Sequence, residues 1–228
     1  MKFLITGGTS GIGRALAENL LTQGHQVAII GRKPGKVADL VDQYKELARV
    51  YQCDVRLPEE VTSSYHTIKS EIGIPDVVIL NAGVGFFGNL EDLTHEQFDL
   101  QFDTNVKGVF NWLKVTLPDL KRQNKGQIVI TSSNLGIETS PRASIYAATK
   151  HAIQAMVSCL RKELVGSDVK VATVNPGSVD TPWFDGKKVD RSRMIDVEAV
   201  VKAFLLIIEQ NQTSDIERIV LLPAKRST

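Results

Sequence analysis

The sequence predicts an α/β protein in which helices cover both faces of one parallel β-sheet. Seven short apolar runs recur along the 228 residues, and segments with helical spacing separate them. The runs are β-branched and apolar on both sides, which is typical of strands buried beneath two layers of helices. Because strands and helices alternate along the chain, we expect one doubly wound sheet with right-handed crossovers. Residues 1–228 are therefore predicted to form a single domain.

The predicted strands are short, and each ends near glycine or polar residues. They lie at 2–6, 26–30, 49–53, 76–80, 127–131, 170–174 and 218–222. Periodic apolar residues predict helices at 11–23, 36–47, 59–71, 94–124, 144–164 and 197–209. Thr94, followed by Gln97, is typical of a capping box at the start of the longest helix. We expect Pro118 to kink this helix or to break off its last turn.

The overall charge and the cysteine and histidine positions exclude several classes of partner. The chain has 27 basic and 26 acidic residues, so no broad field attracts nucleic acid or an anionic membrane. Its two cysteines lie far apart, and no spacing of cysteine or histidine is typical of a metal site. No apolar run approaches the ~20 residues of a membrane span, and the apolar N-terminal run is too short for a signal peptide. We expect a cytoplasmic protein without nucleic acid, membrane or metal partners.

A glycine-rich turn joins the first predicted strand to the first helix. The segment reads Thr6-Gly-Gly-Thr-Ser-Gly-Ile-Gly13, with glycines in G-x-x-x-G-x-G spacing. Such a turn lets the backbone approach a pyrophosphate, and the helix N-terminus presents free N–H groups to it. A flexible loop is the alternative interpretation, but the position between a strand and a helix favours nucleotide binding.

The end of the second predicted strand indicates which nucleotide binds. Enzymes that use NAD usually place an acidic residue there, which binds the ribose hydroxyls. This strand ends instead at Arg32 and Lys33, two cations that attract a 2′-phosphate. A solvated basic pair is the alternative, but the missing acid and the added cations together favour NADP(H).

Four motifs give the chain a resemblance to the short-chain dehydrogenase/reductase family over essentially its whole length. They are the glycine turn, Asn81-Ala-Gly83, Tyr146-Ala-Ala-Thr-Lys150 and Asn175-Pro-Gly177, in the family's order. The resemblance implies a Rossmann-like fold with about seven strands in the order 3-2-1-4-5-6-7. It also implies an oxidoreductase that forms homodimers or homotetramers. Leu80 stands where the family often has a further asparagine.

The resemblance implies four catalytic residues. Ser133 lies thirteen residues before Tyr146, as the family's catalytic serine does, whereas the spacing of the adjacent Ser132 is wrong. Lys150 completes the Tyr-x-x-x-Lys motif. Asn105 matches the family's asparagine on the long helix, where it would anchor a water that passes protons to Lys150. Each residue alone is compatible with a structural role, and only the set supports catalysis.

The implied cofactor-binding residues belong to the strand ends and the catalytic helix. They are Gly7, Thr9, Ser10, Gly11, Ile12, Gly13, Arg32, Lys33, Asp54, Val55, Asn81, Ala82, Gly83, Tyr146, Lys150, Pro176, Gly177, Val179 and Thr181. Asp54 resembles the residue that meets the adenine amino group, and Thr181 the residue that holds the nicotinamide carboxamide. Lys150 is expected to bind the nicotinamide ribose hydroxyls.

The chemistry of ketone reduction explains the spacing of Tyr146 and Lys150. A tyrosine has an unperturbed pKa of about 10, and a lysine one helical turn away favours the tyrosinate. Because the two positions are i and i+4, they share one helix face. Tyr146 then acts as general acid in reduction and general base in oxidation, while Ser133 holds the substrate oxygen.

We therefore expect an NADP(H)-dependent carbonyl reductase that also works as an alcohol dehydrogenase. Within the family the chain resembles bacterial-type 3-oxoacyl carrier-protein reductases and general ketone reductases, and the sequence does not choose between them. A non-catalytic NADP(H) sensor of the same fold is a second hypothesis. A serine hydrolase is a third, opposed by the absence of a G-x-S-x-G motif.

Residues 181–196 are predicted to form a short, irregular substrate loop. Trp183 and Phe184 follow Thr181, where they line either the substrate pocket or the core. The loop's four cations belong either to a solvated mobile segment, the interpretation we favour, or to a site for an anionic substrate. They are Lys187, Lys188, Arg191 and Arg193.

Overall fold

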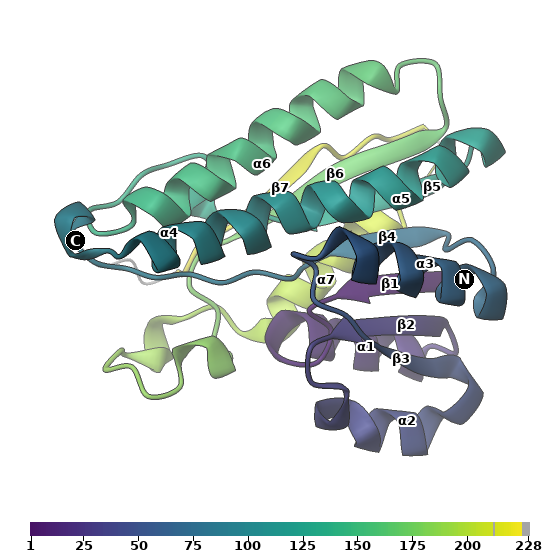
Figure 1. The fold of residues 1–228 in the computed structure, drawn as a ribbon, viewed down its shortest axis with the longest axis horizontal. Helices are drawn as coiled ribbons and strands as arrows, with labels where there is room; N and C mark the ends of the chain where they lie inside the picture. The colour runs from purple at the N-terminus through teal and green to yellow at the C-terminus, as the bar shows by residue number, and fades with distance from the viewer. Residues whose placement is uncertain (212, 225–228) are drawn as a thin grey trace.

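The computed structural model, which describes residues 1–211 and 213–224, contains one parallel sheet of seven strands (Figure 1). The strands are β1 (Lys2–Thr6), β2 (Gln26–Gly31), β3 (Ala48–Gln52), β4 (Val77–Leu80), β5 (Gly126–Thr131), β6 (Val169–Pro176) and β7 (Arg218–Leu221). Their order across the sheet is β3-β2-β1-β4-β5-β6-β7, and every neighbouring pair is parallel. The predicted fold class and strand order are confirmed.

Helices form a layer on each face of the sheet (Figure 1). They are α1 (Gly11–Thr22), α2 (Ala38–Tyr44), α3 (Pro58–Ile72), α4 (His95–Phe102), α5 (Gly108–Gln123), α6 (Ser144–Glu163) and α7 (Val197–Ile208). Side chains alternate between the two faces along each strand. In β1, Phe3 and Ile5 pack with α1, α2 and α7, whereas Leu4 packs with α3, α5 and α6. Both faces of the central strands are therefore buried, as their apolar sequences indicated, whereas Arg218 and Val220 of the edge strand β7 are exposed.

The carboxyl ends of the parallel strands meet at one edge of the sheet. β1 and β4 are neighbours there, with Thr6 opposite Leu80. The glycine turn that follows β1 and the Asn81 segment that follows β4 therefore start side by side. The strand order reverses direction between β1 and β4, and such a switch point is where open α/β sheets bind their ligands.

The helix predicted at 94–124 begins as expected. Thr94 and Gln97 form the predicted capping box, in which each side chain bonds the backbone N–H of the other residue. After α4, however, the chain makes one π-helical turn, Asp103–Lys107, before α5 continues. Such turns are frequent at functional sites, and this one carries Asn105.

Pro118 does not break off the last turn of this helix, so that part of the prediction is wrong. Pro118 lies inside α5, which continues to Gln123. A proline leaves the carbonyl four residues earlier, that of Lys114, without its helical donor. Lys114 and Pro118 are both exposed, so water can reach this carbonyl and the helix continues.

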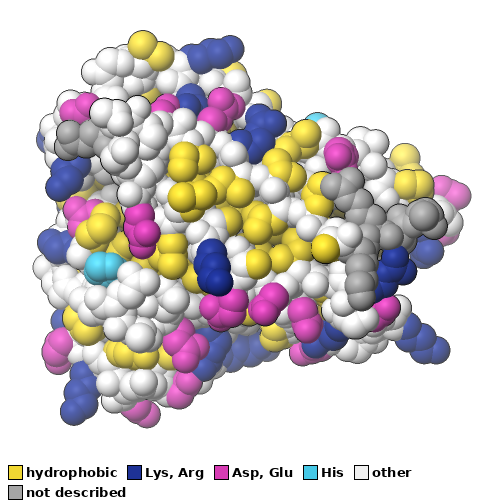
Figure 2. Space-filling view, turned by 180° about the vertical axis from the view of Figure 1, so that it is seen from behind, with side chains coloured by type: hydrophobic (Ala, Val, Ile, Leu, Met, Phe, Trp, Pro, Cys, Tyr) yellow, Lys and Arg dark blue, Asp and Glu magenta, His cyan; other side chains and the backbone are white. Residues whose placement is uncertain are grey.

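Hydrophobic side chains gather near the middle of the molecular face seen from behind (Figure 2). Large exposed hydrophobic residues of the chain include Leu206 of α7 and Val220 of β7. Exposed apolar surface of this kind is typical of protein–protein interfaces, and the homo-oligomer stays a prediction. In the part of the chain that the structure describes, no helix combines the length and the apolar character that crossing a membrane requires.

Candidate active site

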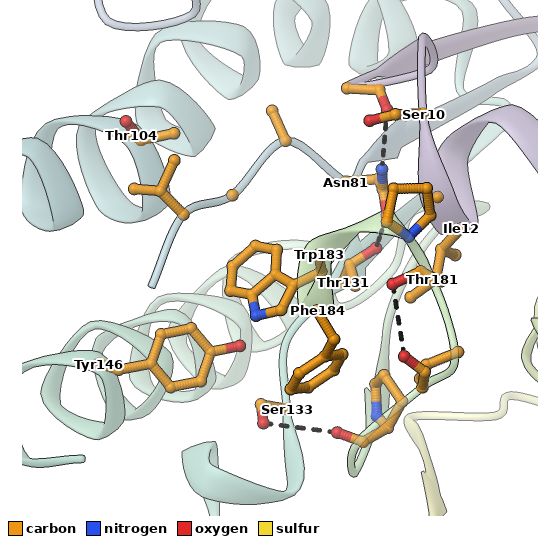
Figure 3. Close-up of a pocket in the computed structure, with 18 of the residues that line it drawn as sticks. Ser10, Ile12, Asn81, Thr104, Thr131, Ser133, Tyr146, Thr181, Trp183 and Phe184 are labelled. Carbon is orange, nitrogen blue, oxygen red and sulfur yellow. Dashed lines mark hydrogen bonds between the residues drawn. The ribbon is translucent and has the colours of Figure 1, made fainter. Parts of the chain in front are cut away.

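A cavity of about 650 Å³ opens at the carboxyl edge of the sheet. The glycine turn after β1, the helix α6 and the loop after β6 all line it, and Thr181 of that loop lies against Gly11. Tyr146 extends from α6 into this space toward Ser133, and Trp183 and Phe184 lie beside it (Figure 3). The structure thus brings three of the four predicted catalytic residues, Ser133, Tyr146 and Lys150, to one cavity.

The glycine turn is shaped for a close backbone approach. Gly7 and Gly11 have φ angles of +64° and +54°, in the left-handed region that favours glycine. A Cβ atom on Gly7 would lie 2.8 Å from the Cα atom of Ala82. Ser10, which precedes α1, does not cap the helix with its side chain. The N–H groups at the start of α1 are therefore free of a side-chain cap, as an anion site requires.

Gly13 does not line the cavity as the cofactor prediction requires. A Cβ atom there would lie 2.4 Å from the carbonyl oxygen of Gly7 and 2.6 Å from Nδ2 of Asn81. Gly13 thus lets α1 pack closely on the turn and on the segment after β4. Its effect on the cavity is therefore indirect, because Gly13 contacts the glycine turn without lining the cavity.

Asn81 ties three strand ends together beneath the cavity. Its Nδ2 donates to the carbonyl oxygens of Thr6 and Gly7, at 3.3 Å each. Its Oδ1 accepts a hydrogen bond from the hydroxyl of Thr131 at 3.0 Å. The carbonyl oxygen of Thr131 in turn accepts from Nζ of Lys150 at 3.0 Å. The glycine turn and the catalytic helix are therefore held in one hydrogen-bonded frame.

The cations near the end of β2 are arranged differently from the prediction. Arg32 lines the cavity, but Lys33 does not, and Lys36 lines it instead. A 3₁₀ turn, Pro34–Val37, begins directly after Lys33 and brings the chain back toward α1. Arg14 of α1 holds this turn by donating to the carbonyl oxygen of Lys36 at 2.7 Å. The structure therefore places Arg32 and Lys36 at the cavity and Lys33 outside its lining, and the cofactor role of Lys33 stays a prediction.

The other predicted cofactor residues line the cavity. They are Gly7, Thr9, Ser10, Gly11, Ile12, Arg32, Asp54, Val55, Asn81, Ala82, Gly83, Tyr146, Lys150, Pro176, Gly177, Val179 and Thr181. Arg56 bonds both carboxylate oxygens of Asp54 and lowers the pKa of this carboxyl below its usual range. Asp54 is thus an ionised acceptor at the adenine end implied by the family resemblance.

Lys150 and the two serines before it face different surroundings. Lys150 is 4% exposed, and its Nζ lies 5.6 Å from the ring centroid of Tyr146. The hydroxyl of Ser132 donates to the carbonyl oxygen of Lys150 at 3.3 Å, whereas that of Ser133 lies 3.4 Å from the carbonyl oxygen of Pro176. Ser132 therefore braces the helix, and Ser133 sits on the floor of the cavity beside Tyr146.

Burial sets the protonation of Tyr146 and Lys150 in the absence of cofactor. It raises the pKa of Tyr146 to about 12, and the Ser133 hydroxyl offsets part of this rise. It lowers the pKa of Lys150 from its usual value to about 8. Each shift disfavours the charged form in a poorly solvated site. The expectation that Lys150 makes Tyr146 more acidic therefore does not describe this state, in which desolvation dominates.

The side chain of Asn105 does not line the cavity and is not free to anchor a water through its amide nitrogen. It is 1% exposed, and its Nδ2 donates to the carbonyl oxygen of Val84 and to the hydroxyl of Thr149. Its Oδ1 accepts the N–H of Val84 at 2.8 Å. Asn105 thus clamps the segment after β4 to α6 and orients the helix that carries Lys150.

Aromatic rings form the wall opposite the glycine turn. The rings of Phe87 and Trp183 lie 5.1 Å and 6.3 Å, centroid to centroid, from the ring of Tyr146. Of the two interpretations of Trp183 and Phe184, lining the pocket is therefore the one that the structure supports. Lys187 also lines the cavity, with its Nζ over three rings, although the residue is exposed, as the solvated-loop interpretation expects.

Arg191 holds the loop that carries these rings. It forms ion pairs with Asp180 and Asp185, at 3.3 Å and 2.7 Å, and donates to the carbonyl oxygen of Thr181 at 2.9 Å. It is therefore part of the loop's framework and is not simply solvated.

Residues 2–192 match the family model of the short chain dehydrogenases. The chain belongs to the short-chain dehydrogenase family. An uncharacterized oxidoreductase of Staphylococcus epidermidis is 30% identical over 220 residues, which cover 96% of each chain. The predicted family is therefore confirmed, and the protein is an oxidoreductase of this family.

Solved structures of short-chain dehydrogenases share the fold. The alcohol dehydrogenase of the archaeon Thermococcus sibiricus, complexed with 5-hydroxy-NADP, is 26% identical with a TM-score of 0.91. The match covers 100% of this chain and 98% of that one. ElxO with NADP bound is 25% identical with a TM-score of 0.89, over 97% of both chains.

Sequence reasoning missed several side chains of this short-chain dehydrogenase site. Thr6 accepts the N–H groups of Asn81 and Ala82 through its hydroxyl oxygen, and Lys36 and Phe87 line the cavity. Lys36 had a local signal, because the preceding Pro-Gly pair is typical of a turn that brings it back toward the strand end. Phe87 had none, because its direction depends on the packing of the segment after β4.

Proposed function

We propose that this short-chain dehydrogenase reduces a ketone to a secondary alcohol with NADPH and catalyses the reverse reaction with NADP⁺. The observation that carries the proposal is the convergence of Ser133, Tyr146 and Lys150 on the cavity that begins at the glycine turn. The NADP-type ligands bound to the Thermococcus alcohol dehydrogenase and to ElxO support the choice of cofactor.

The residues around the cavity fit a dinucleotide with a 2′-phosphate. The positive φ angles of Gly7 and Gly11 and the uncapped start of α1 suit a pyrophosphate. Arg32 and Lys36 provide two cations where the adenosine 2′-phosphate of NADP(H) would lie. When bound, NADPH supplies the hydride for the substrate carbon.

Side chains of the protein donate the proton and stabilise the negative charge that develops on the carbonyl oxygen. Negative charge grows on the carbonyl oxygen during reduction, and Tyr146 donates its phenolic proton to that oxygen. Ser133 donates a hydrogen bond to the same oxygen and orients it. Lys150, anchored on Thr131 and close to the Tyr146 ring, stabilises the tyrosinate that remains. In oxidation the same tyrosinate takes the proton of the alcohol.

A substrate panel tests the proposal directly. Aryl ketones, cyclic ketones and a 3-oxoacyl thioester are each incubated with NADPH or NADH, and the loss of reduced nucleotide is followed by absorbance. We expect turnover with NADPH and much slower turnover with NADH. Binding of NADPH without turnover of any carbonyl would contradict the proposal and favour a non-catalytic sensor. Preferred turnover of the thioester would identify a 3-oxoacyl carrier-protein reductase.

We expect Arg32→Ala and Lys36→Ala each to weaken NADPH binding about tenfold or more. A charge-assisted hydrogen bond contributes about 1.5–3 kcal/mol, and about 1.4 kcal/mol corresponds to a factor of ten. NADH lacks the 2′-phosphate, so its affinity should stay nearly unchanged. Calorimetric titration with each nucleotide measures both effects. Lys33→Ala is the matched control, and an equal loss in this variant would restore the assignment made from the sequence.

The pH dependence of the two directions reports the pKa of Tyr146. Because burial raises this pKa to about 12, Tyr146 stays protonated near neutral pH and is ready to donate in reduction. Oxidation needs the tyrosinate, whose small fraction grows tenfold with each pH unit below the pKa. Between about pH 6 and pH 7, where Lys150 keeps most of its proton, we expect kcat/KM for oxidation to rise and that for reduction to stay flat.

The informative result of that experiment is which of the two kcat/KM values, for oxidation or for reduction, changes with pH. Reduction consumes one proton, so the ratio of the two kcat/KM values must change tenfold per pH unit in any such enzyme. A flat oxidation profile with reduction falling above pH 7 would place the pKa of Tyr146 near or below neutral. That result would mean that Lys150 and the bound cofactor outweigh burial.

A further inference from the structure

Lys187 places a positive charge on the substrate side of the cavity. Its Nζ lies 5.4 Å from the ring centroid of Phe184 and 5.6 Å from that of Trp183. The ring of Phe87 lies 5.7 Å away on the same measure. Aromatic faces attract an ammonium group and hold it in place. Since Phe87 and Trp183 also contact the ring of Tyr146, one layer of rings separates Lys187 from the proton donor.

No acidic side chain neutralises Lys187 in the described part of the chain. The acidic neighbours Asp180 and Asp185 are both ion-paired with Arg191 instead. The contacts that the structure gives the Lys187 ammonium are with ring faces, which carry no negative charge, and the residue is otherwise exposed to solvent. This charge is therefore available to a ligand that enters the cavity.

Much of the remaining lining of the cavity is apolar. Among the described residues that line the cavity, the single acid is Asp54, which is bonded to Arg56 at the β3 end of the sheet. The apolar members of the lining include Val84, Phe87, Leu135, Trp183, Phe184 and Val189, and the polar Ser133 and Asn134 also belong to the lining. A ligand beside Tyr146 therefore contacts these apolar side chains and can reach the charge of Lys187.

We propose that Lys187 binds a carboxylate on the substrate, so that this enzyme prefers carbonyl compounds that combine an apolar body with an anionic group. The inference rests on the proposed function, because it assigns the substrate of the same site. The carbonyl oxygen faces Tyr146 and Ser133, the apolar body lies against Phe87 and Trp183, and the carboxylate reaches Lys187. A neutral ketone of the same shape keeps the first two contacts and loses the third.

A rival occupant of the same rings is a cationic substrate. Three ring faces that hold the ammonium of Lys187 would also attract a ligand ammonium if Lys187 moved aside. The anionic substrate is favoured because Lys187 already occupies the rings and, among the described residues that line the cavity, the one acid is Asp54, which is paired with Arg56.

Three ketones that differ mainly in charge test the proposal. They are 4-acetylbenzoate, its neutral methyl ester and the 4-acetylphenyl-trimethylammonium cation, each reduced with NADPH. We expect wild-type enzyme to have the lowest KM for 4-acetylbenzoate. Lys187→Gln should raise that KM about tenfold, with little change in kcat and none in the KM of the ester. Lys187→Arg, which keeps the charge, should restore most of the preference.

Lys188→Gln is the matched control, because Lys188 is an adjacent exposed lysine that does not line the cavity. It should leave all three KM values unchanged, and NADPH affinity should be the same in every variant. Equal KM values for the acid and the ester, or an equal loss of both in Lys187→Gln, would overturn the proposal and leave Lys187 a packing role. The lowest KM for the trimethylammonium ketone would overturn it in favour of a cationic substrate.

A binding measurement separates this proposal from the proposed function. Calorimetry of 4-acetylbenzoate with the NADP⁺-loaded protein needs no turnover. Binding that is lost in Lys187→Gln, without reduction of any ketone, would support the anion site and contradict the reductase. Reduction of the ester without preferential binding of the acid would contradict the anion site and leave the reductase intact. The absence of any binding of 4-acetylbenzoate to wild type would also contradict the anion site.

Discussion

Tyr146→Phe should reduce ketone turnover by about 10²–10⁴-fold, the range in which positioned proton donors contribute to catalysis. Phenylalanine keeps the ring that packs against Phe87 and Trp183 but has no proton to donate to the carbonyl oxygen. Lys150 and Ser133 keep their own backbone partners, so the cavity should retain its shape. The measurement is kcat and KM for an accepted ketone with NADPH, beside the dissociation constant of NADPH.

Tyr44→Phe is a matched control for that loss. Tyr44 lies in α2, away from the cavity, and its hydroxyl makes an exposed hydrogen bond with Thr22 at 2.9 Å. We expect this variant to keep full activity. If Tyr146→Phe reduced ketones at a rate close to that of wild type, the role of Tyr146 as proton donor would be wrong. Loss of NADPH binding in that variant would instead indicate a damaged site.

Gly13→Ala should weaken NADPH binding strongly and destabilise the fold, although Gly13 does not line the cavity. The added methyl group would lie 2.4 Å from the carbonyl oxygen of Gly7, and a backbone atom of this turn cannot swing aside as a flexible side chain can. Overpacking of this kind costs about 1–3 kcal/mol of folding free energy. Because the displaced group is the glycine turn itself, we expect NADPH affinity to fall at least about tenfold.

Gly35→Ala provides the control for Gly13→Ala. No described atom lies within 4 Å of a Cβ built at Gly35, and its φ is not in the left-handed region. Thermal unfolding and calorimetric titration with NADPH should therefore match wild type within error. A Gly13→Ala protein with wild-type stability and affinity would show that α1 can shift away from the turn without cost.

Much of the fold could be predicted because burial leaves a clear pattern in the sequence. All four residues of β4 are buried, and a strand covered on both faces must be apolar throughout. The glycine turn could be predicted for a related reason, since positive φ angles at Gly7 and Gly11 favour the one residue without a Cβ. The irregularity of the long helix was located wrongly. Pro118 is a local signal, whereas the π-helical turn depends on what Asn105 must reach across the fold.

The sequence by itself determined the layers, because apolar periodicity is a property of the chain, and the resemblance to the family implied the strand order and the set Ser133, Tyr146 and Lys150. Only the tertiary structure decided where the side chains point and how well water reaches them. It placed Lys36 rather than Lys33 at the cavity, since a 3₁₀ turn begins directly after Lys33 and carries Lys36. It buried Lys150 and half-buried Tyr146, and desolvation then set their pKa values. It also brought Lys187 over rings that come from separate segments, because cation–π contacts need proximity that no sequence spacing specifies.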